Sequence, residues 1–332
     1  MIEQAMATAL AASAAAVGVS SPNPPVGAVI LDADGTVVGV GRTQPVGGPH
    51  AEVMALREAG PAARGGTAVV TLEPCNHTGR TGPCAQALLD AGVAAVHYAV
   101  ADPNPQAAGG AAALAAAGVT VVGGVAEQQA RRGPLRHWLF RQAQGRPLVT
   151  AKIAATLDGR IAAPDGTSVW ITGPESRAHA HAQRAHLDAL VIGTGTALAD
   201  NPSLTARRPD GTLHAHQPAR AVLGHRDLPA DATLRDGAAP LVQVRSHDPR
   251  DVLAALPDAL WILVEGGPAV LGAFLAAGLV DEVQAYLAPT ILGDGRAAVL
   301  DSSVTTLAQA HHLRRESIAV LGEDLLITLS AH

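Results

Sequence analysis

The sequence predicts two α/β domains in tandem, and three observations support this prediction. The chain has 332 residues, more than a single hydrophobic core usually accommodates. Short apolar runs alternate with helical segments, which is typical of sheets covered by helices. This alternation stops at Gly145-Arg146-Pro147 and then begins again. We therefore expect one domain in residues 1–146 and a second in residues 147–332.

The composition restricts the class of protein. Apolar residues make up 48% of the chain and aromatic residues only 2%, so Ala, Val and Leu are expected to build the cores. The net charge of −6 and the lack of basic runs argue against a nucleic-acid partner. No apolar run reaches membrane-spanning length. The Ala-rich start carries Glu3 and no basic segment, unlike a signal peptide. The sequence thus predicts a cytoplasmic protein without a membrane contact.

In the first half, a hairpin is expected to precede alternating helices and strands. A helix over residues 5–17 leads to a rigid loop at Ser21–Pro25. Asp32–Gly35 is a hairpin signal between strands at 26–31 and 36–41. Further expected strands are 67–72, 93–100 and 119–122, and further helices are 50–59, 83–90 and 111–117. This order predicts an α/β/α layer with a site beyond the strand ends.

The second half repeats the alternation and ends in antiparallel strands. Pro174 and Pro268 are expected to begin helices that end near His186 and Ala277. The expected strands are 148–154, 189–192, 221–223, 241–244, 261–264, 281–287 and 324–329. The sequence therefore predicts a second α/β domain.

The strongest chemical signal combines His50 and Glu52 with Cys75 and Cys84, the only two cysteines of the chain. In zinc deaminases, a His and two thiolates bind Zn²⁺, and a nearby Glu that is not a ligand transfers the proton. The usual signature is H-x-E followed by P-C-x-x-C, whereas here the second cysteine lies nine positions after the first. The alternative is a pair of buried free thiols. A disulfide is disfavoured, because no secretory signal places the chain in an oxidising compartment.

The expected chemistry at this site is hydrolytic. His50, Cys75 and Cys84 bind Zn²⁺, while Glu52 takes a proton from water and delivers it to departing ammonia. The helix that begins near Pro83 favours the thiolate of Cys84. Three further residues are expected to bind the substrate. Asn23 would hydrogen-bond the base or the ribose of the substrate, and His77 and Arg80 would bind its phosphate.

Several segments resemble the bifunctional deaminase/reductase family of riboflavin biosynthesis. The deaminase half of that family is similar to Ser21–Gly27, Pro49–Glu52 and Thr71–Cys84. Its reductase half is similar to Ala151–Arg160, Trp170–Gly173, Gly195-Thr196, Asp200–Pro202, Leu204-Thr205 and Glu265–Pro268. The resemblance extends from about residue 5 to residue 330. It implies a cytidine-deaminase-like domain followed by a dihydrofolate-reductase-like domain, with Zn²⁺ and NADPH as cofactors.

The resemblance also implies two successive reactions on a phosphorylated aminopyrimidine. The first hydrolyses the 2-amino group of a diaminohydroxy-phosphoribosylaminopyrimidine, and the second uses NADPH to reduce the ribosyl chain to ribityl. For the second step, Lys152 and Asp200 are the candidate acids. Lys152 is the only lysine of the chain, and we expect it at the end of a strand. Asp200 is expected on the loop after Gly195.

The second half lacks a G-x-G-x-x-G motif, so a Rossmann domain is not supported. Two glycine-containing segments follow strands instead: Gly193-Thr194-Gly195-Thr196 and Glu265-Gly266-Gly267. At these glycines the backbone can approach a pyrophosphate closely. By resemblance, Trp170, Thr172, Thr196 and Arg226 join Glu265, Gly266 and Gly267 as cofactor contacts. The residues similar to the family's substrate contacts are Ser168, Arg184, Leu204 and Arg207. A homo-oligomer, either a dimer or a tetramer, is expected.

The chain departs from the family pattern at Thr43–Pro45, Ala111, Arg131–Pro134 and Gly224-His225. Four alternatives stay open. One is a related enzyme that acts on another modified pyrimidine, and one is a nucleoside or tRNA deaminase, which leaves residues 148–330 without a role. The others are a monofunctional reductase with a structural zinc and a zinc scaffold without catalysis. A structural site needs a fourth ligand, which counts against the scaffold.

Overall fold

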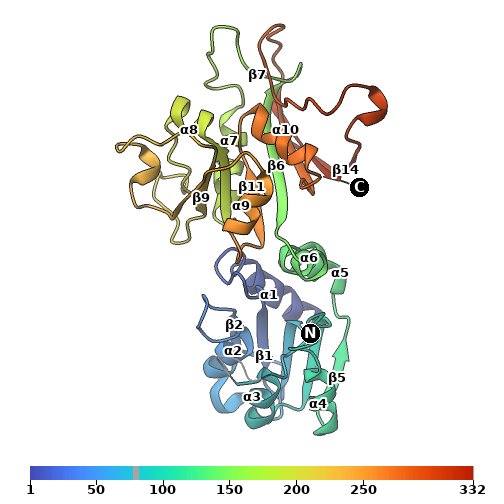
Figure 1. Ribbon diagram of the computed structural model, residues 1–332. Helices are drawn as coiled ribbons and strands as arrows, with labels where there is room; N and C mark the ends of the chain where they lie inside the picture. The colour runs from blue at the N-terminus through green and yellow to red at the C-terminus, as the bar shows by residue number, and fades with distance from the viewer. Residues whose placement is uncertain (78–81, 332) are drawn as a thin grey trace. The chain divides into compact units, whose positions relative to one another are not determined.

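The computed structural model describes residues 1–77 and 82–331, and the chain divides into two compact units at Arg146/Pro147 (Figure 1). The helices of the first unit are α1 (Ile2–Ala14), α2 (Ala51–Ala59), α3 (Cys84–Ala91), α4 (Gly110–Ala116), α5 (Glu127–Arg132) and α6 (Arg136–Gln144), with a 3₁₀ turn at Gly60–Ala63. Its strands are β1 (Gly27–Leu31), β2 (Val37–Arg42), β3 (Thr67–Leu72), β4 (Ala95–Val100) and β5 (Thr120–Gly123). They form one sheet in the order β2-β1-β3-β4-β5.

Two glycines allow helices to approach this sheet closely from opposite faces. A side-chain carbon on Gly27 would collide with the backbone carbonyl of Ala9 in α1, and one on Gly41 would collide with that of Ala51 in α2. Gly41 pairs with Ala28, the neighbour of Gly27, and successive residues of a strand point to opposite faces. The unit is therefore an α/β/α layer, and the start of α2 is held against the sheet.

The second unit is built on an eight-stranded sheet of order β10-β9-β8-β11-β6-β12-β15-β14. Its strands are β6 (Leu148–Thr156), β8 (Ala189–Gly193), β9 (Ala219–Leu223), β10 (Leu241–Val244), β11 (Trp261–Val264), β12 (Glu282–Ala288), β14 (Leu313–Leu321) and β15 (Asp324–Ala331). A separate pair joins β7 (Arg160–Ala162) and β13 (Arg296–Ala297). The helices are α7 (Pro174–Arg184), α8 (Thr194–Asp200), α9 (Pro249–Ala255) and α10 (Pro268–Ala276), with 3₁₀ turns at Thr233–Arg235 and Leu307–Gln309.

The strands from β10 to β12 run parallel, whereas β15 and β14 are antiparallel. Two apolar clusters cover the sheet. One contains Phe274 of α10 with Val149 and Ile262, and the other contains Leu190 and Leu234. Because parallel strands end at the same edge of a sheet, the loops after β6, β8, β9, β10 and β11 gather at one edge.

The predicted alternation of strands and helices is confirmed in both halves, but several details differ. Helices α5, α6, α8 and α9 and strands β7, β13 and β14 were not predicted. Lys152 lies within β6 rather than at its end, because β12 pairs with this strand as far as Thr156. Asp200 is the last residue of α8 rather than part of a loop.

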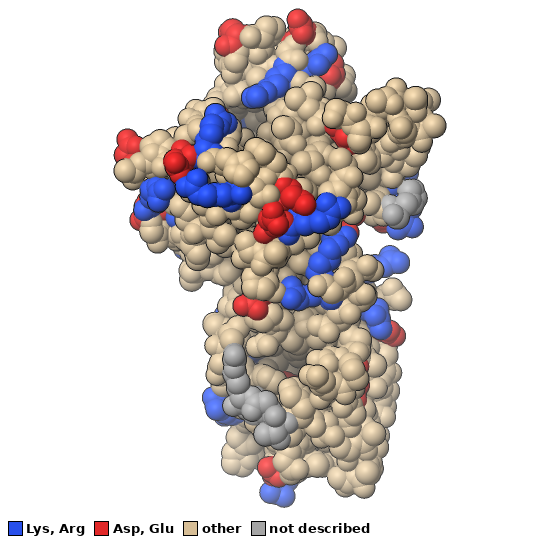
Figure 2. Space-filling view, viewed as in Figure 1, with Lys and Arg blue, Asp and Glu red and all other residues tan. Residues whose placement is uncertain are grey.

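None of the described helices combines the length and the apolar character that a membrane crossing requires. On the face of the second unit seen in Figure 2, basic and acidic side chains are interspersed. This part of the described surface does not present a continuous basic band for a nucleic-acid backbone.

Candidate active sites

The first site joins three side chains that different elements hold in place. His50 precedes the first residue of α2, Cys75 follows β3, and Cys84 begins α3. The Nδ1 atom of His50 lies 3.2 Å from the Sγ atom of Cys84 and 3.6 Å from that of Cys75. All three donor atoms lie within 4.8 Å of one another. Tetrahedral zinc with bonds of about 2.0–2.3 Å separates its ligands by roughly 3.5 Å, so the donor set fits zinc.

The two cysteines form a polarised pair. A hydrogen bond with Cys84 lowers the pKa of Cys75 to about 4, and the nearby His50 also lowers this pKa. The pKa of Cys84 is raised, because its thiol shares the same hydrogen bond and is buried. The backbone N–H of Cys84 donates to the Sγ atom of Cys75 at 3.4 Å. Cys75 is thus a thiolate at neutral pH, the form that binds a metal.

Glu52 is the buried carboxyl group beside this cluster. Only 4% of the residue is exposed, and it lies in the first turn of α2. Burial, followed by the negative charge of Cys75, raises its pKa to about 7. A carboxyl group with this pKa can both accept and return a proton near neutral pH, as a general acid–base group must.

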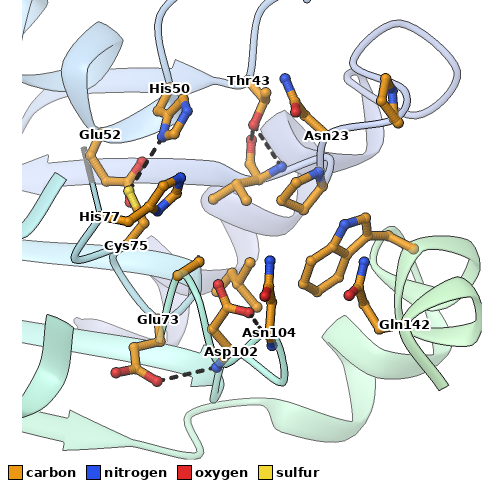
Figure 3. Close-up of a pocket in the computed structure, with 16 residues that line it drawn as sticks. Asn23, Thr43, His50, Glu52, Glu73, Cys75, His77, Asp102, Asn104 and Gln142 are labelled. Carbon is orange, nitrogen blue, oxygen red and sulfur yellow. Dashed lines mark hydrogen bonds between the residues drawn. The ribbon is translucent and has the colours of Figure 1, made fainter. Parts of the chain in front are cut away.

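His50, Cys75 and Glu52 line a cavity of ≈ 240 Å³ (Figure 3). Asn23, from the loop before β1, lies at this cavity, as does His77. Arg80, the other predicted phosphate contact, falls outside the described residues. Figure 3 shows Gln142 of α6 on the far side of the cavity from His50 and Cys75. Trp138 of the same helix also lines the cavity and is only 4% exposed.

Glu73 shapes one wall of the cavity. Its carboxylate accepts hydrogen bonds from the backbone N–H groups of Asp102 at 3.2 Å, Gly109 at 3.1 Å and Ala111 at 3.0 Å. These bonds hold the loop after β4, from which Asp102 and Asn104 reach the cavity. Glu73 is therefore a support for the loop, and Glu52 is the carboxyl group beside the metal ligands.

The second site is a larger cavity of ≈ 1100 Å³ at the carboxyl ends of the parallel strands. Its lining includes Lys152 of β6, Gly195 and Asp200 of α8, Arg226 after β9 and His247 after β10. β9 is three strands from β6 in the sheet, or roughly 14 Å at the usual strand spacing. A ligand that reaches both Lys152 and Arg226 must therefore be extended, as a dinucleotide is.

A buried group of charges lies at the Lys152 end. The carboxylate of Glu265 binds the guanidinium of Arg184 at two points, 3.1 and 2.7 Å, and lies 3.7 Å from the Nζ atom of Lys152. Burial would raise the pKa of Glu265, but Arg184 and Lys152 outweigh it and lower this pKa to about 2. Glu265 is therefore a carboxylate at neutral pH, and its negative charge attracts the ammonium of Lys152.

The two halves of the chain match two families. Residues 1–100 match the cytidine and deoxycytidylate deaminase zinc-binding region, and residues 147–327 match the RibD C-terminal domain. The riboflavin biosynthesis protein RibD of Mycobacterium tuberculosis is 49% identical over 330 residues, which cover 99% of this chain and 97% of that protein. The chain belongs to the RibD family. It is therefore a bifunctional deaminase/reductase of riboflavin biosynthesis, with zinc and NADPH as its cofactors.

Solved RibD structures have the same fold over the whole chain. Acinetobacter baumannii RibD is 34% identical, with a TM-score of 0.88 and coverage of 100% of this chain and 99% of that one. A Thermotoga maritima diaminohydroxyphosphoribosylaminopyrimidine deaminase/5-amino-6-(5-phosphoribosylamino)uracil reductase gives the same TM-score and coverage at 29% identity. These likenesses confirm the predicted fold class, an N-terminal cytidine-deaminase-like domain followed by a RibD reductase domain.

Within this RibD-family chain, the predicted reductase residues fall into two groups. Eight of them line the second cavity: Lys152, Ser168, Thr196, Asp200, Arg226, Glu265, Gly266 and Gly267. Five are not among its described lining residues: Trp170, Thr172, Arg184, Leu204 and Arg207.

The five residues outside the lining have other surroundings. Trp170 is 73% exposed, with its ring beneath the guanidinium of Arg177, which also donates to the Thr172 carbonyl. Leu204 is packed in an apolar cluster, so its side chain does not reach the cavity. The Nε atom of Arg207 donates to the Thr205 hydroxyl. Arg184 does not line the cavity itself, but it holds Glu265, which does, in a two-point ion pair. The predicted contacts of these five residues with ligands stay predictions.

Other lining residues were missed. In the first cavity they include Thr43, Glu73, Asp102, Asn104, Trp138 and Gln142. Asp102-Pro103-Asn104-Pro105, directly after an expected strand, was the available signal for Asp102 and Asn104. In the second cavity the missed residues include His247, whose ring lies edge-on to that of His225 with the ring centroids 4.8 Å apart.

Proposed function

We propose that the first unit deaminates 2,5-diamino-6-(5-phosphoribosylamino)pyrimidin-4-one by hydrolysis, and that the second unit then reduces the ribosyl chain of the product to ribityl with NADPH. The observation that carries the proposal is the meeting of His50, Cys75 and Cys84 beside the buried Glu52, which lines a cavity. The lone lysine lies in a second cavity of the same chain.

In the first unit, His50, Cys75 and Cys84 would hold the zinc ion. When bound, zinc would supply a water of lowered pKa for the hydrolysis. The Glu52 carboxylate accepts a proton from water and returns it to the 2-amino group as ammonia leaves. The amide of Asn23 and the polar groups of Asp102 and Asn104 are placed to hydrogen-bond the pyrimidine ring, since all three line the cavity.

In the second unit, NADPH supplies a hydride to the ribosyl carbon when it is bound. The Lys152 ammonium polarises or protonates the sugar oxygen, and the carboxylate of Glu265 lies 3.7 Å from its Nζ atom. Asp200 is the other candidate acid. The glycines at 195, 266 and 267 leave room for the pyrophosphate of the cofactor. Arg226 and His247 are suited to its 2′-phosphate, because they line the opposite end of the cavity. A dimeric or tetrameric state and a cytoplasmic location stay predictions from the sequence.

The test is to supply the aminopyrimidine phosphate with and without NADPH, while ammonia release and cofactor oxidation are followed. We expect ammonia without NADPH, and oxidation of NADPH only after the deaminated product has formed. Oxidation of NADPH that precedes ammonia release would reverse the proposed order. Full ammonia release by a chain without zinc would exclude the proposed hydrolytic site.

A further inference from the structure

The ammonium of Lys152 has an aromatic neighbour as well as an anionic one. Its Nζ atom lies 5.6 Å from the centroid of the Tyr286 ring and 3.7 Å from a carboxylate oxygen of Glu265. A cation within about 6 Å of a ring centroid is attracted by the negative face of the ring. Both distances exceed that of a hydrogen bond. Neither of these two contacts therefore occupies an N–H donor of Lys152, which can donate to a ligand in the cavity that this residue lines.

The fold places Tyr286 beside Lys152. β12 pairs in parallel with β6, so that Gln284 is opposite Lys152 and Tyr286 is opposite Ala154. Residues two positions apart on a strand point to the same face, and Tyr286 therefore shares a sheet face with Lys152. Tyr286 is only 1% exposed, so its ring is fixed by packing.

Helix α7 fixes the other end of the ring. The Nδ1 atom of His179 lies 2.8 Å from the Tyr286 hydroxyl oxygen, a short hydrogen-bond distance. The same helix carries Arg184, which holds Glu265 at two points. Because Glu265 shares its charge with Arg184, it attracts Lys152 less than an isolated carboxylate would. The ring is then a second attraction that defines where the ammonium lies.

We propose that Tyr286 is a positioning residue for the reduction: the face of its ring holds the Lys152 ammonium toward the cavity, and His179 holds the ring. This inference rests on the proposed function, in which Lys152 acts on the sugar. Tyr286 itself touches neither cofactor nor substrate in this proposal. Its contribution is to hold one orientation of a side chain that otherwise has many rotamers.

The experiment replaces Tyr286 in the full-length chain with phenylalanine and then with mono-, di- and trifluorinated phenylalanines. Fluorine withdraws electrons from the ring face and weakens its attraction for a cation, while the volume of the ring changes little. We expect the reductase kcat to fall stepwise along the series, by roughly ten-fold from phenylalanine to the trifluorinated ring, with KM for NADPH unchanged. The same series at Phe274, fully buried in α10, is the matched control and is expected to leave kcat unchanged.

Three outcomes would overturn the proposal: a flat series at Tyr286, an equal decline at Phe274, or a decline at Tyr286 that persists in a Lys152→Met background. Failure of the proposed function is distinct from these outcomes. It would be seen as a wild-type chain that does not oxidise NADPH with the deaminated substrate, or as a Lys152→Met variant with full reductase activity.

Discussion

Arg184 and Glu265 meet in a two-point ion pair, with the Nε atom 3.1 Å from Oε1 and the Nη2 atom 2.7 Å from Oε2. Only 14% and 10% of the two side chains are exposed. The pair ties α7 to the loop after β11. It also fixes the carboxylate that faces Lys152, so a single contact supports both the fold and the site.

Glu265→Gln is expected to destabilise the second unit by about 3 kcal/mol, because it leaves the buried guanidinium of Arg184 without its counter-charge. Hydrogen exchange of the β11 amides at increasing urea concentrations measures this change. Asp227→Asn is the matched control. It breaks the surface pair with Arg245, whose side chains are 78% and 58% exposed, and should cost less than about 1 kcal/mol. Equal effects of the two substitutions would contradict the prediction.

The stability of the second unit should depend on pH through Glu265. Its pKa is about 2 in the folded chain against an ordinary value of 4.5, so the unfolded chain binds its proton first as pH falls. The stabilisation is therefore complete above about pH 4.5 and is lost progressively below it. The difference in unfolding free energy between the wild type and Glu265→Gln should be constant at neutral pH and shrink in acid. A difference that stays constant down to pH 3 would argue against the low pKa.

Removal of zinc should separate the two activities. A chelator is expected to abolish ammonia release and to leave NADPH oxidation with the deaminated substrate intact, because the described residues that line the second cavity include none of the three ligands. Elemental analysis should find close to one zinc per chain, and Cys75→Ser should lose it. Restoration of ammonia release by added zinc is the control. Parallel loss of both activities would contradict this prediction.

Glu52→Gln should keep zinc and lower the kcat of ammonia release by about 10²–10⁴-fold, the usual contribution of a general acid–base group. Glu73→Gln is the comparison, since both carboxyl groups are buried at the same cavity. Glu73 supports a loop, so its substitution should act mainly on KM and stability. Similar losses of kcat in both variants would contradict the assignment of Glu52 as the general acid–base group.

Arg226→Ala should raise KM for NADPH by roughly 10–100-fold, the effect of losing one or two charge-assisted hydrogen bonds to a phosphate. KM for NADH should not change, because NADH lacks the 2′-phosphate. Arg245→Ala is the control, an exposed arginine that is not among the described residues lining the cavity. An equal rise in KM for NADPH and for NADH would show that Arg226 does not bind the 2′-phosphate.

The zinc ligands were predictable because each belongs to a local pattern. His50 precedes a helix, Cys75 follows a strand and Cys84 begins a helix, so short-range signals placed all three at one edge of the sheet. Tyr286 had no such signal. Its position beside Lys152 depends on the pairing of β12 with β6, strands more than 120 residues apart. Pairing of this kind is decided by tertiary packing rather than by local sequence.

Two reductase residues were also misplaced. Lys152 was expected at a strand end, yet pairing with β12 extends β6 to Thr156. Asp200 was expected on the loop after Gly195, yet it is the last residue of α8, which forms through this glycine although glycine is a weak helix former. The departure from the family pattern at Arg131–Pro134 falls at the end of α5 and just before α6, and neither helix was predicted.

The deaminase unit extends beyond the last strand of its sheet, because helix α6 contributes to the wall of its cavity. A gene cut after Gly123 would encode all five strands and every metal ligand, yet omit Trp138 and Gln142 from the cavity wall. Such a fragment would still bind zinc but would bind the pyrimidine more weakly. Anyone separating the two enzymes should therefore carry the first one through to Arg146.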